Sequence, residues 1–247
     1  MTILGIEPID AGVADPQAFG SKPILFFDID GVLNRIPFEE VYIGPDCGHE
    51  FGYYWQSGVC EHYKNMDNWE IRRWKLDADL FDDVPDDVHE GLRIHQEWQT
   101  KLWVSEELRS ELRRIEDSGE ADIVFLSMWQ ENTRYLNGLM GTHFPYLEVP
   151  QKLSESETGA KHQALFRFLK KVYLSHGSIP PFTWADDVVT ADSYRGTIQQ
   201  VVSSWLKANG LNEPASLIFY TEPEEGLKRS QWQQILDFIA TWAPQTG

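Results

Sequence analysis

Short apolar runs alternate with amphipathic stretches along most of this chain. The runs at residues 23–28, 121–126 and 182–185 are too short for helices and rich in branched and aromatic residues, so they predict buried strands. Between them, apolar positions recur at helical spacing, as in residues 105–117 behind the N-cap candidate Ser105. Strands that alternate with helices predict the α/β class with a parallel sheet. The expected strands are 23–28, 121–126, 182–185 and 216–220, and the expected helices are 105–117, about 130–139, one that opens at Thr158, 192–208 and 228–242.

Two segments interrupt this pattern. Residues 1–22 are rich in Gly, Pro and Asp and lack a period, so we expect a loosely ordered leader. Residues 35–100 are too long for a compact connection, and we expect an insertion over the edge of the sheet. The domain prediction is therefore a core of residues 1–34 and 101–247 and a cap or flap of residues 35–100. The many aromatic residues of the insertion are expected to form its own small core, with closure over a site or stacking on a base as the alternative.

Two carboxylates, Asp28 and Asp30, close the first apolar run in the string ILFFDIDGVLN. The C-terminal end of a buried parallel strand is where open α/β sheets bind ligands. Neighbouring carboxylates repel each other, so they need a cation or a shared proton, and Mg²⁺ suits oxygen ligands. Plain surface aspartates are the alternative. An EF-hand calcium loop is excluded because Val32 and Leu33 occupy positions that require an acidic residue and a glycine.

Three later features extend the pattern. Ser127 follows the second run, and a hydroxyl at a strand end can bond to a phosphoryl oxygen. Lys161 falls in the first turn of an expected helix, where the helix dipole disfavours a cation, which suggests a functional charge. Asp186 and Asp187 follow the third run, and adjacent carboxylates at a buried strand end are costly without a cation. Each feature alone has a simpler explanation, because many strands end in serine and most helix lysines are exposed.

In this order the four features resemble the motifs of the haloacid dehalogenase (HAD) superfamily of phosphotransferases. The resemblance covers residues 24–34 and about 121–187. It implies a Rossmann-like, three-layer fold with a parallel sheet and a cap or flap insertion after the first strand. The DGVLN ending, the region from Ser127 to Trp129 and the C-terminal EEGLKRSQWQQILDFIATW look most similar to small HAD domains of phage and bacterial RNA-repair proteins, although no kinase P-loop accompanies them.

The resemblance also implies a role for each residue. Asp28 would be the nucleophile and Asp30 the general acid/base. Ser127 and Lys161 would bind the phosphoryl group, with Lys152 as the rival lysine. The implied side chains of the Mg²⁺ site are Asp28, Asp30, Asp186 and Asp187, with Asp187 as a direct ligand and Asp186 acting through water or Lys161.

These roles imply a Mg²⁺-dependent phosphatase that hydrolyses a phosphomonoester through an aspartyl-phosphate intermediate. Asp30 argues against dehalogenase chemistry, because that branch of the family lacks the second aspartate. One alternative is a 3′-phosphatase that acts on nucleic-acid ends in RNA or DNA repair. The alternative from another class is a non-catalytic module that keeps the fold for binding or regulation.

Composition narrows the expected partners. The net charge of −18 disfavours a polyanion and favours a small phosphorylated substrate. The acidic run from Asp77 to Glu90 is expected to be a solvated, flexible face, and repulsion of polyanions is its functional alternative. The cluster of Arg72, Arg73 and Lys75 is the feature that would serve a nucleic-acid end. The sequence shows no N-terminal signal and no apolar run near the roughly 18 residues of a membrane span, so we expect a cytoplasmic protein without a membrane partner.

Both cysteines of the chain lie in a C-x-H repeat formed by Cys47, His49, Cys60 and His62. Cysteine and histidine are zinc ligands, which makes a structural zinc site one hypothesis for the insertion. The one-residue spacer is shorter than the usual zinc spacing. Two ordinary thiols beside two polar histidines are the simpler alternative.

Overall fold

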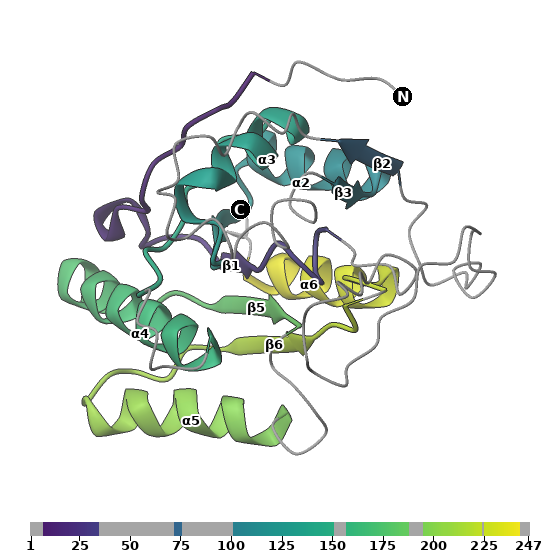
Figure 1. The fold of residues 1–247 in the computed structure, drawn as a ribbon. Coiled ribbons are helices and arrows are strands. Elements are labelled where there is room, and N and C mark those ends of the chain that lie inside the picture. Colours follow the sequence, from purple (N-terminus) through teal and green to yellow (C-terminus); the bar gives the residue numbers. More distant parts are fainter. Residues whose placement is uncertain are drawn as a thin grey trace, which may run out of the picture.

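The computed structural model describes residues 7–34, 72–75, 101–150, 157–187, 195–223 and 225–242. Within these ranges the chain is an α/β protein with a four-stranded parallel sheet, a separate two-stranded ribbon and five α-helices (Figure 1). The class and the parallel sheet predicted from the sequence are confirmed. The strands are β1 (Ile24–Phe27), β2 (Arg72–Lys75), β3 (Lys101–Val104), β4 (Asp122–Phe125), β5 (Phe182–Asp186) and β6 (Ser216–Tyr220), and the helices are α2 (Glu106–Ser118), α3 (Thr133–Met140), α4 (Glu157–His176), α5 (Arg195–Ala208) and α6 (Arg229–Trp242), with short 3₁₀ turns η1 (Pro16–Ala18) and η4 (Gln130–Asn132).

Strand β1 lies in the middle of the parallel sheet, whose order is β4-β1-β5-β6. In the register, Ile24 of β1 is level with Asp122 of β4 and with Phe182 of β5. All four residues of β1 are buried, which explains its unbroken apolar run, because a parallel strand covered on both faces has no polar side. The chain leaves β1 toward β4 on one side and later returns to β5 on the other, so β1 marks the switch point of the sheet.

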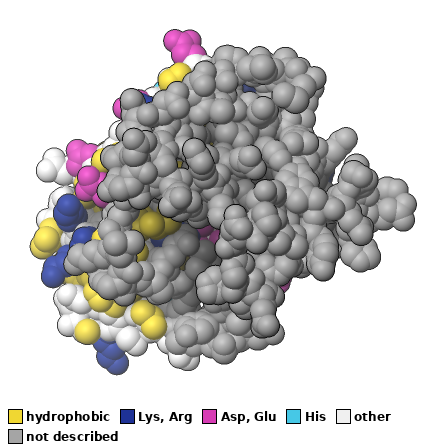
Figure 2. All heavy atoms as spheres, in the orientation of Figure 1, with side chains coloured by type: hydrophobic (Ala, Val, Ile, Leu, Met, Phe, Trp, Pro, Cys, Tyr) yellow, Lys and Arg dark blue, Asp and Glu magenta, His cyan; other side chains and the backbone are white. Residues whose placement is uncertain are grey.

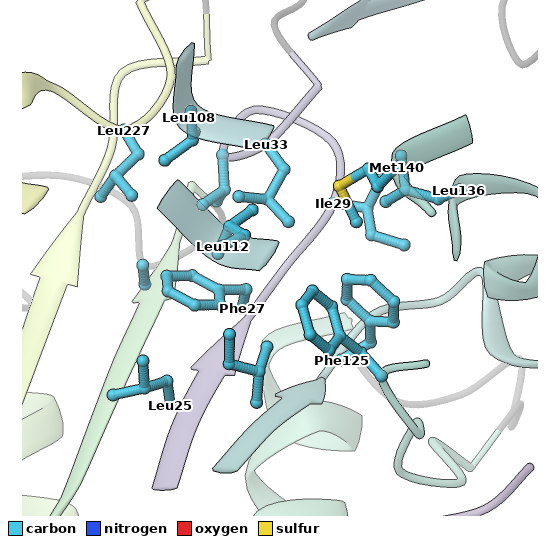
Figure 3. Packing of buried hydrophobic residues seen from close by; sticks show 14 of the residues in the cluster. Leu25, Phe27, Ile29, Leu33, Leu108, Leu112, Phe125, Leu136, Met140 and Leu227 are labelled. Atoms are coloured by element: carbon cyan, nitrogen blue, oxygen red, sulfur yellow. The ribbon is translucent and has the colours of Figure 1, made fainter. Parts of the chain in front are cut away.

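Alternating side chains of β1 enter two separate cores. Leu25 and Phe27 pack with helices α2, α3 and α6, while Ile24 and Phe26 pack with α4 and α5. In Figure 1, α4 and α5 lie together on one side of β5 and β6, with α6 on the other. Figure 3 shows the first core, where Phe27 lies beneath Leu112 of α2. The sheet between two helical layers gives the three-layer arrangement of a Rossmann-like fold.

Helix α2 shows why a predicted element forms where it does. The Ser105 hydroxyl accepts a hydrogen bond from the backbone N–H of Leu108, which caps the helix. At the other end Gly119 adopts the left-handed conformation, with φ of +64°, and stops it. Leu108, Leu112 and Ile115 are buried, as the apolar stripe predicts.

The expectation of a loose leader is wrong for residues 7–22. The Ala14 backbone N–H donates to Tyr146 O at 2.9 Å, and Tyr146 N–H donates to Gly12 O at 3.1 Å. Phe19 is buried and meets Phe168 of α4 edge to face, with ring centroids 5.2 Å apart. These anchors are too far apart in the sequence to form a period, so pattern analysis overlooks them.

Only part of the expected insertion can be compared with the structure. Strand β2 is its described segment, and it pairs antiparallel with β3, where Arg73 is level with Trp103 and Lys75 with Lys101. The cap or flap elsewhere in residues 35–100, the acidic run and the four zinc candidates lie outside the described residues, as does Lys152. Of the helices in the described part of the chain, none combines the length and apolar character needed to cross a membrane.

Candidate active site

Three carboxylates converge at the C-terminal edge of the parallel sheet. Asp28 follows β1, Asp186 is the last residue of β5, and Asp187 comes next. One side-chain oxygen of each lies within 4.8 Å of the others. Because β1 and β5 are adjacent at the switch point of the sheet, two motifs about 160 residues apart in the sequence meet at the place where α/β proteins bind ligands.

Asp28 is almost fully buried and is held at both oxygens. Its Oδ1 accepts the backbone N–H of Ile29 at 2.7 Å, and its Oδ2 accepts Nζ of Lys161 at 2.5 Å. The Ser127 hydroxyl also hydrogen-bonds to this carboxyl group. Burial raises the pKa of Asp28, and the Lys161 ammonium and the hydrogen bonds oppose that rise. The carboxylate of Asp28 is therefore fixed in one orientation and faces a cation.

Lys161 is the cation of this site, and its side chain is fully buried. Its Nζ lies 2.5 Å from Asp28 and 3.1 Å from Asp186, so it bridges the ends of β1 and β5. Helix α4 begins at Glu157, one residue before the expected start, so Lys161 lies just beyond the first turn rather than inside it. The two carboxylates, more than the helix dipole, explain why a lysine is buried here.

Asp186 and Asp187 have different surroundings. Asp186 is buried, and its Oδ2 accepts the indole N–H of Trp184 at 3.2 Å in addition to Lys161. This contact with Lys161 is one of the two arrangements that the family resemblance implies for Asp186. Asp187 is less buried, and burial together with Asp28 and Asp186 raises its pKa from the ordinary 3.8 to about 8.

Gly31 makes room for Asp187. A Cβ atom on Gly31 would lie 2.1 Å from Oδ2 of Asp187, closer than any real side-chain contact. Gly31 also has a φ of +70°, a left-handed conformation that glycine adopts without strain. Its carbonyl oxygen accepts the Thr221 hydroxyl at 2.8 Å, which ties this loop to the residue after β6. The glycine in the first motif is thus required twice, by the turn and by the neighbouring carboxylate.

The carboxylate of Asp30 stands apart from the other three. Its Oδ1 accepts the Asn34 side-chain amide at 2.6 Å, and its Oδ2 accepts the indole N–H of Trp129 at 2.8 Å. Burial raises the pKa of Asp30, while the bonds from Trp129 and Asn34 lower it. Of the four side chains expected around the metal, the structure brings Asp28, Asp186 and Asp187 together and leaves Asp30 outside that group.

Four polar contributors to this site were not anticipated: Trp129, Asn34, Trp184 and Thr221. Thr221 follows β6 as Ser127 follows β4, so the argument that singled out one hydroxyl also applied to the other. Asn34 closes the turn that carries the two aspartates, where the backbone N–H of Gly31 donates to Asn34 O at 2.7 Å. Trp129 falls in the region from Ser127 to Trp129 that contributes to the family resemblance, but nothing in the sequence assigned it a role, and nothing pointed to Trp184.

The donor set fits a small divalent cation. Asp28, Asp186 and Asp187 offer hard carboxylate oxygens, which Mg²⁺ prefers. Lys161 compensates Asp28 and Asp186 by direct contact, whereas burial and the nearby Asp28 and Asp186 raise the pKa of Asp187 and so disfavour its charged form. A divalent cation beside Asp28 and Asp187 would supply the missing charge.

A hollow lies away from these aspartates. It has a volume of about 300 Å³ and lies between the N-terminal segment, the loop at Val149 and helix α4, with Arg167 and Lys171 in its lining. Figure 2 shows Lys and Arg side chains beside hydrophobic ones on the side of the molecule where α4 and α5 lie. None of the residues proposed for chemistry lines this cavity.

Comparisons with protein-family models, with curated proteins and with solved structures find no match to this chain. The geometry of the aspartates and Lys161, together with the motif resemblance, is what points to a function for this chain. The fold places the motifs, but fold alone does not define an activity.

Proposed function

We propose that this protein is a Mg²⁺-dependent phosphatase of the HAD type that hydrolyses phosphomonoesters through a phosphorylated Asp28. The observation that carries the proposal is the position of Lys161, fully buried between Asp28 and Asp186 with Asp187 beside them. A structural ion pair would need one carboxylate for one lysine. Extra buried carboxylates at the ligand-binding edge of the sheet are costly for stability and are typical of a site that handles cations and phosphate.

Two displacements at phosphorus follow from these roles. In the first, a carboxylate oxygen of Asp28 attacks phosphorus, the bond to the leaving oxygen breaks, and Asp30 gives that oxygen its proton. In the second, water attacks the same phosphorus while Asp30 takes a proton from it. The bond between phosphorus and Asp28 then breaks, which releases inorganic phosphate and restores both aspartates.

The remaining residues stabilise charge. Ser127 and Lys161 already lie at the Asp28 carboxylate, so they are close to the phosphoryl oxygens during both displacements. Asp28 and Asp187 would hold Mg²⁺, with Asp186 keeping Lys161 in place. The bound ion would neutralise charge on the transferring phosphoryl group.

A 3′-phosphatase for nucleic-acid ends is the second candidate. The observation in its favour is the ribbon of β2 and β3, where the register sets Lys75 opposite Lys101 and Arg73 opposite Trp103, so these three basic residues fall within one short ribbon. The net charge of −18 opposes it and favours small substrates such as nucleotides or sugar phosphates. The two candidates share the same chemistry at Asp28 and differ in what binds beyond the phosphate.

Asp28→Asn tests the proposed chemistry, because it removes the nucleophile and keeps the shape of the side chain. We expect the purified full chain to hydrolyse p-nitrophenyl phosphate with Mg²⁺ and the variant to lose turnover by a factor of at least about 10³. Asp117→Asn, a change at an exposed carboxylate of α2, is the matched control and should keep full activity. Wild-type-like turnover by Asp28→Asn would refute the mechanism, and an inactive wild type would favour the non-catalytic alternative.

The same assay separates the two substrate classes. kcat/KM for mononucleotides and sugar phosphates is compared with kcat/KM for 3′-phosphorylated oligonucleotides at two salt concentrations. We expect the small substrates to be preferred at both. An oligonucleotide preference that fades with salt would instead favour the second candidate and the basic ribbon.

A further inference from the structure

The indole of Trp129 reaches across the site to Asp30. Trp129 is 6% exposed, and its Nε1–H donates to Oδ2 of Asp30 at 2.8 Å, a contact between residues 99 positions apart. Asn34 holds the other oxygen at 2.6 Å. With a donor on each oxygen the carboxylate cannot rotate, yet each oxygen keeps a second lone pair that can carry a proton. Asp30 is therefore held in one orientation without losing its capacity to exchange protons.

The backbone beside Trp129 is unusual. Among the described residues other than glycine, Gln130 is the one with a positive φ, at +46°. Its side-chain amide donates to the carbonyl oxygen of Val149 at 3.0 Å, which anchors the turn. A strained backbone persists only where its surroundings hold it, and such positions cluster at functional sites. The strain falls next to the residue whose side chain reaches Asp30.

The same segment also contacts the nucleophile. The backbone N–H of Trp129 donates to the Ser127 hydroxyl oxygen at 3.4 Å, and that hydroxyl bonds to Asp28. Residues 127–130 therefore connect the two catalytic aspartates from one side. A shift of this turn would move the proton donor relative to the attacking oxygen, and small misplacements of this kind are costly in rate.

We propose that Trp129 is a positioning residue for proton transfer by Asp30, with Gln130 as its brace. The inference rests on the proposed phosphatase function. The indole holds the Asp30 carboxyl group so that its proton passes to the leaving oxygen in the first displacement. The same group then accepts a proton from the attacking water in the second.

Leaving groups of different acidity isolate this role. An alkyl phosphate needs the proton of Asp30 in the first displacement, whereas p-nitrophenolate leaves without one. For Trp129→Phe, which keeps the ring and removes the N–H, we expect kcat for an alkyl phosphate to fall about tenfold or more, with KM changed less than about twofold. With p-nitrophenyl phosphate we expect a rapid burst of p-nitrophenolate followed by slow turnover, because only the second displacement requires Asp30.

Another tryptophan of the chain provides the matched control. Trp242→Phe removes an indole from the end of α6, where the residue is 45% exposed, and should leave both substrates unaffected. Trp129→Phe with wild-type kcat on the alkyl phosphate, or with a change in KM alone, would overturn the proposal. Thermal unfolding of each variant shows whether the fold is intact.

A second variant covers the case in which Trp129→Phe does not fold. Gln130→Gly keeps the left-handed backbone without strain and removes the amide anchor, so we expect a smaller fall in kcat on the alkyl phosphate and an unchanged KM. One indole N–H resonance, that of Trp129, should move when Asp30→Ala removes the acceptor, and where Trp129→Phe folds the same resonance should be missing from its spectrum. Unchanged kcat in Gln130→Gly, or an unmoved resonance, counts against the proposal.

Different results would refute the phosphatase function and the role of Trp129. An inactive wild type refutes the phosphatase function and the positioning role of Trp129 with it. An active wild type with an inactive Asp28→Asn and a fully active Trp129→Phe refutes the role of Trp129 alone.

Discussion

Asp187→Asn should make the metal-free protein more stable at neutral and alkaline pH. The pKa of Asp187 is raised from 3.8 to about 8 because the carboxyl group is buried near Asp28 and Asp186. The folded protein therefore binds a proton that the unfolded chain has already released between about pH 4 and 8, and its stability falls as the pH rises through that window. Asparagine has the shape of the protonated side chain and carries no such penalty.

The size of this destabilisation follows from the difference between the folded-state and unfolded-state pKa values of Asp187. Each pH unit between the unfolded-state and folded-state pKa values contributes about 1.4 kcal/mol. The loss in the free energy of unfolding reaches about 4 kcal/mol at pH 7, counted from the ordinary pKa of 3.8. Above pH 8 this loss levels off at about 6 kcal/mol. These figures are ceilings, since the unfolded chain retains structure and the asparagine amide must also be satisfied in the folded state. A gain of about 2–4 kcal/mol at pH 8 is the expected result.

Urea unfolding with a chelator present, at four pH values from 4.5 to about 8.5, measures this gain. The difference between Asp187→Asn and the wild type should be near zero at the lowest pH and grow steadily with pH. Added Mg²⁺ should reverse the order at pH 8, because it stabilises the wild type by binding the ionised carboxylate. Asp117→Asn on the exposed face of α2 should show neither effect. A difference that stays constant with pH would refute the electrostatic argument.

Two further changes test the surroundings of this carboxylate. Gly31→Ala should cost about 2–4 kcal/mol in urea unfolding, because it adds left-handed strain and a Cβ that would lie 2.1 Å from Asp187 Oδ2; Gly210→Ala has a similar φ of +65° with nothing within 4 Å of the Cβ, so it should cost only about 1 kcal/mol. Lys161→Met should destabilise the metal-free protein by about 3–5 kcal/mol at pH 7 and by less at pH 4, since it leaves Asp28 and Asp186 without their shared cation. An equal cost for the two glycine variants, or a pH-independent cost for Lys161→Met, would contradict these explanations.

Strands β1 and β5 could be predicted from the sequence because every residue in them is buried, which gives a largely apolar run. Residues 216–220 were predicted with the bounds that the structure shows, and residues 182–185 fell one residue short. The missing residue is Asp186, whose charge suggested a strand end, although the register pairs it with Tyr220 of β6. Helix α3 was expected from about residue 130, but the positive φ of Gln130 delays the regular helix to Thr133.

From the sequence, only the site residues that lie at the ends of strands could be predicted. Asp28, Ser127 and Asp186 follow from the rule that ligands gather at the carboxyl edge of a parallel sheet. The rule says nothing about which way a side chain turns after the strand stops. Asp30 turns toward Trp129 and Asn34, and the position of Trp129 depends on a strained turn held by a carbonyl group in another loop. Contacts of this kind depend on three-dimensional packing and leave no period in the sequence.

The balance of buried charge at this site depends on Lys161. Lys161 is in contact with Asp28 and Asp186, whereas burial and the nearby Asp28 and Asp186 raise the pKa of Asp187 to about 8. A protein selected for stability alone would replace such carboxylates with apolar residues, because buried charge in excess is costly. Under the proposed function this excess would serve a cation and a phosphoryl group that enter together, since each would offset charge that the other leaves unbalanced. Metal and phosphate are therefore expected to bind cooperatively, with Lys161 moving its interaction from the carboxylates toward the incoming phosphate.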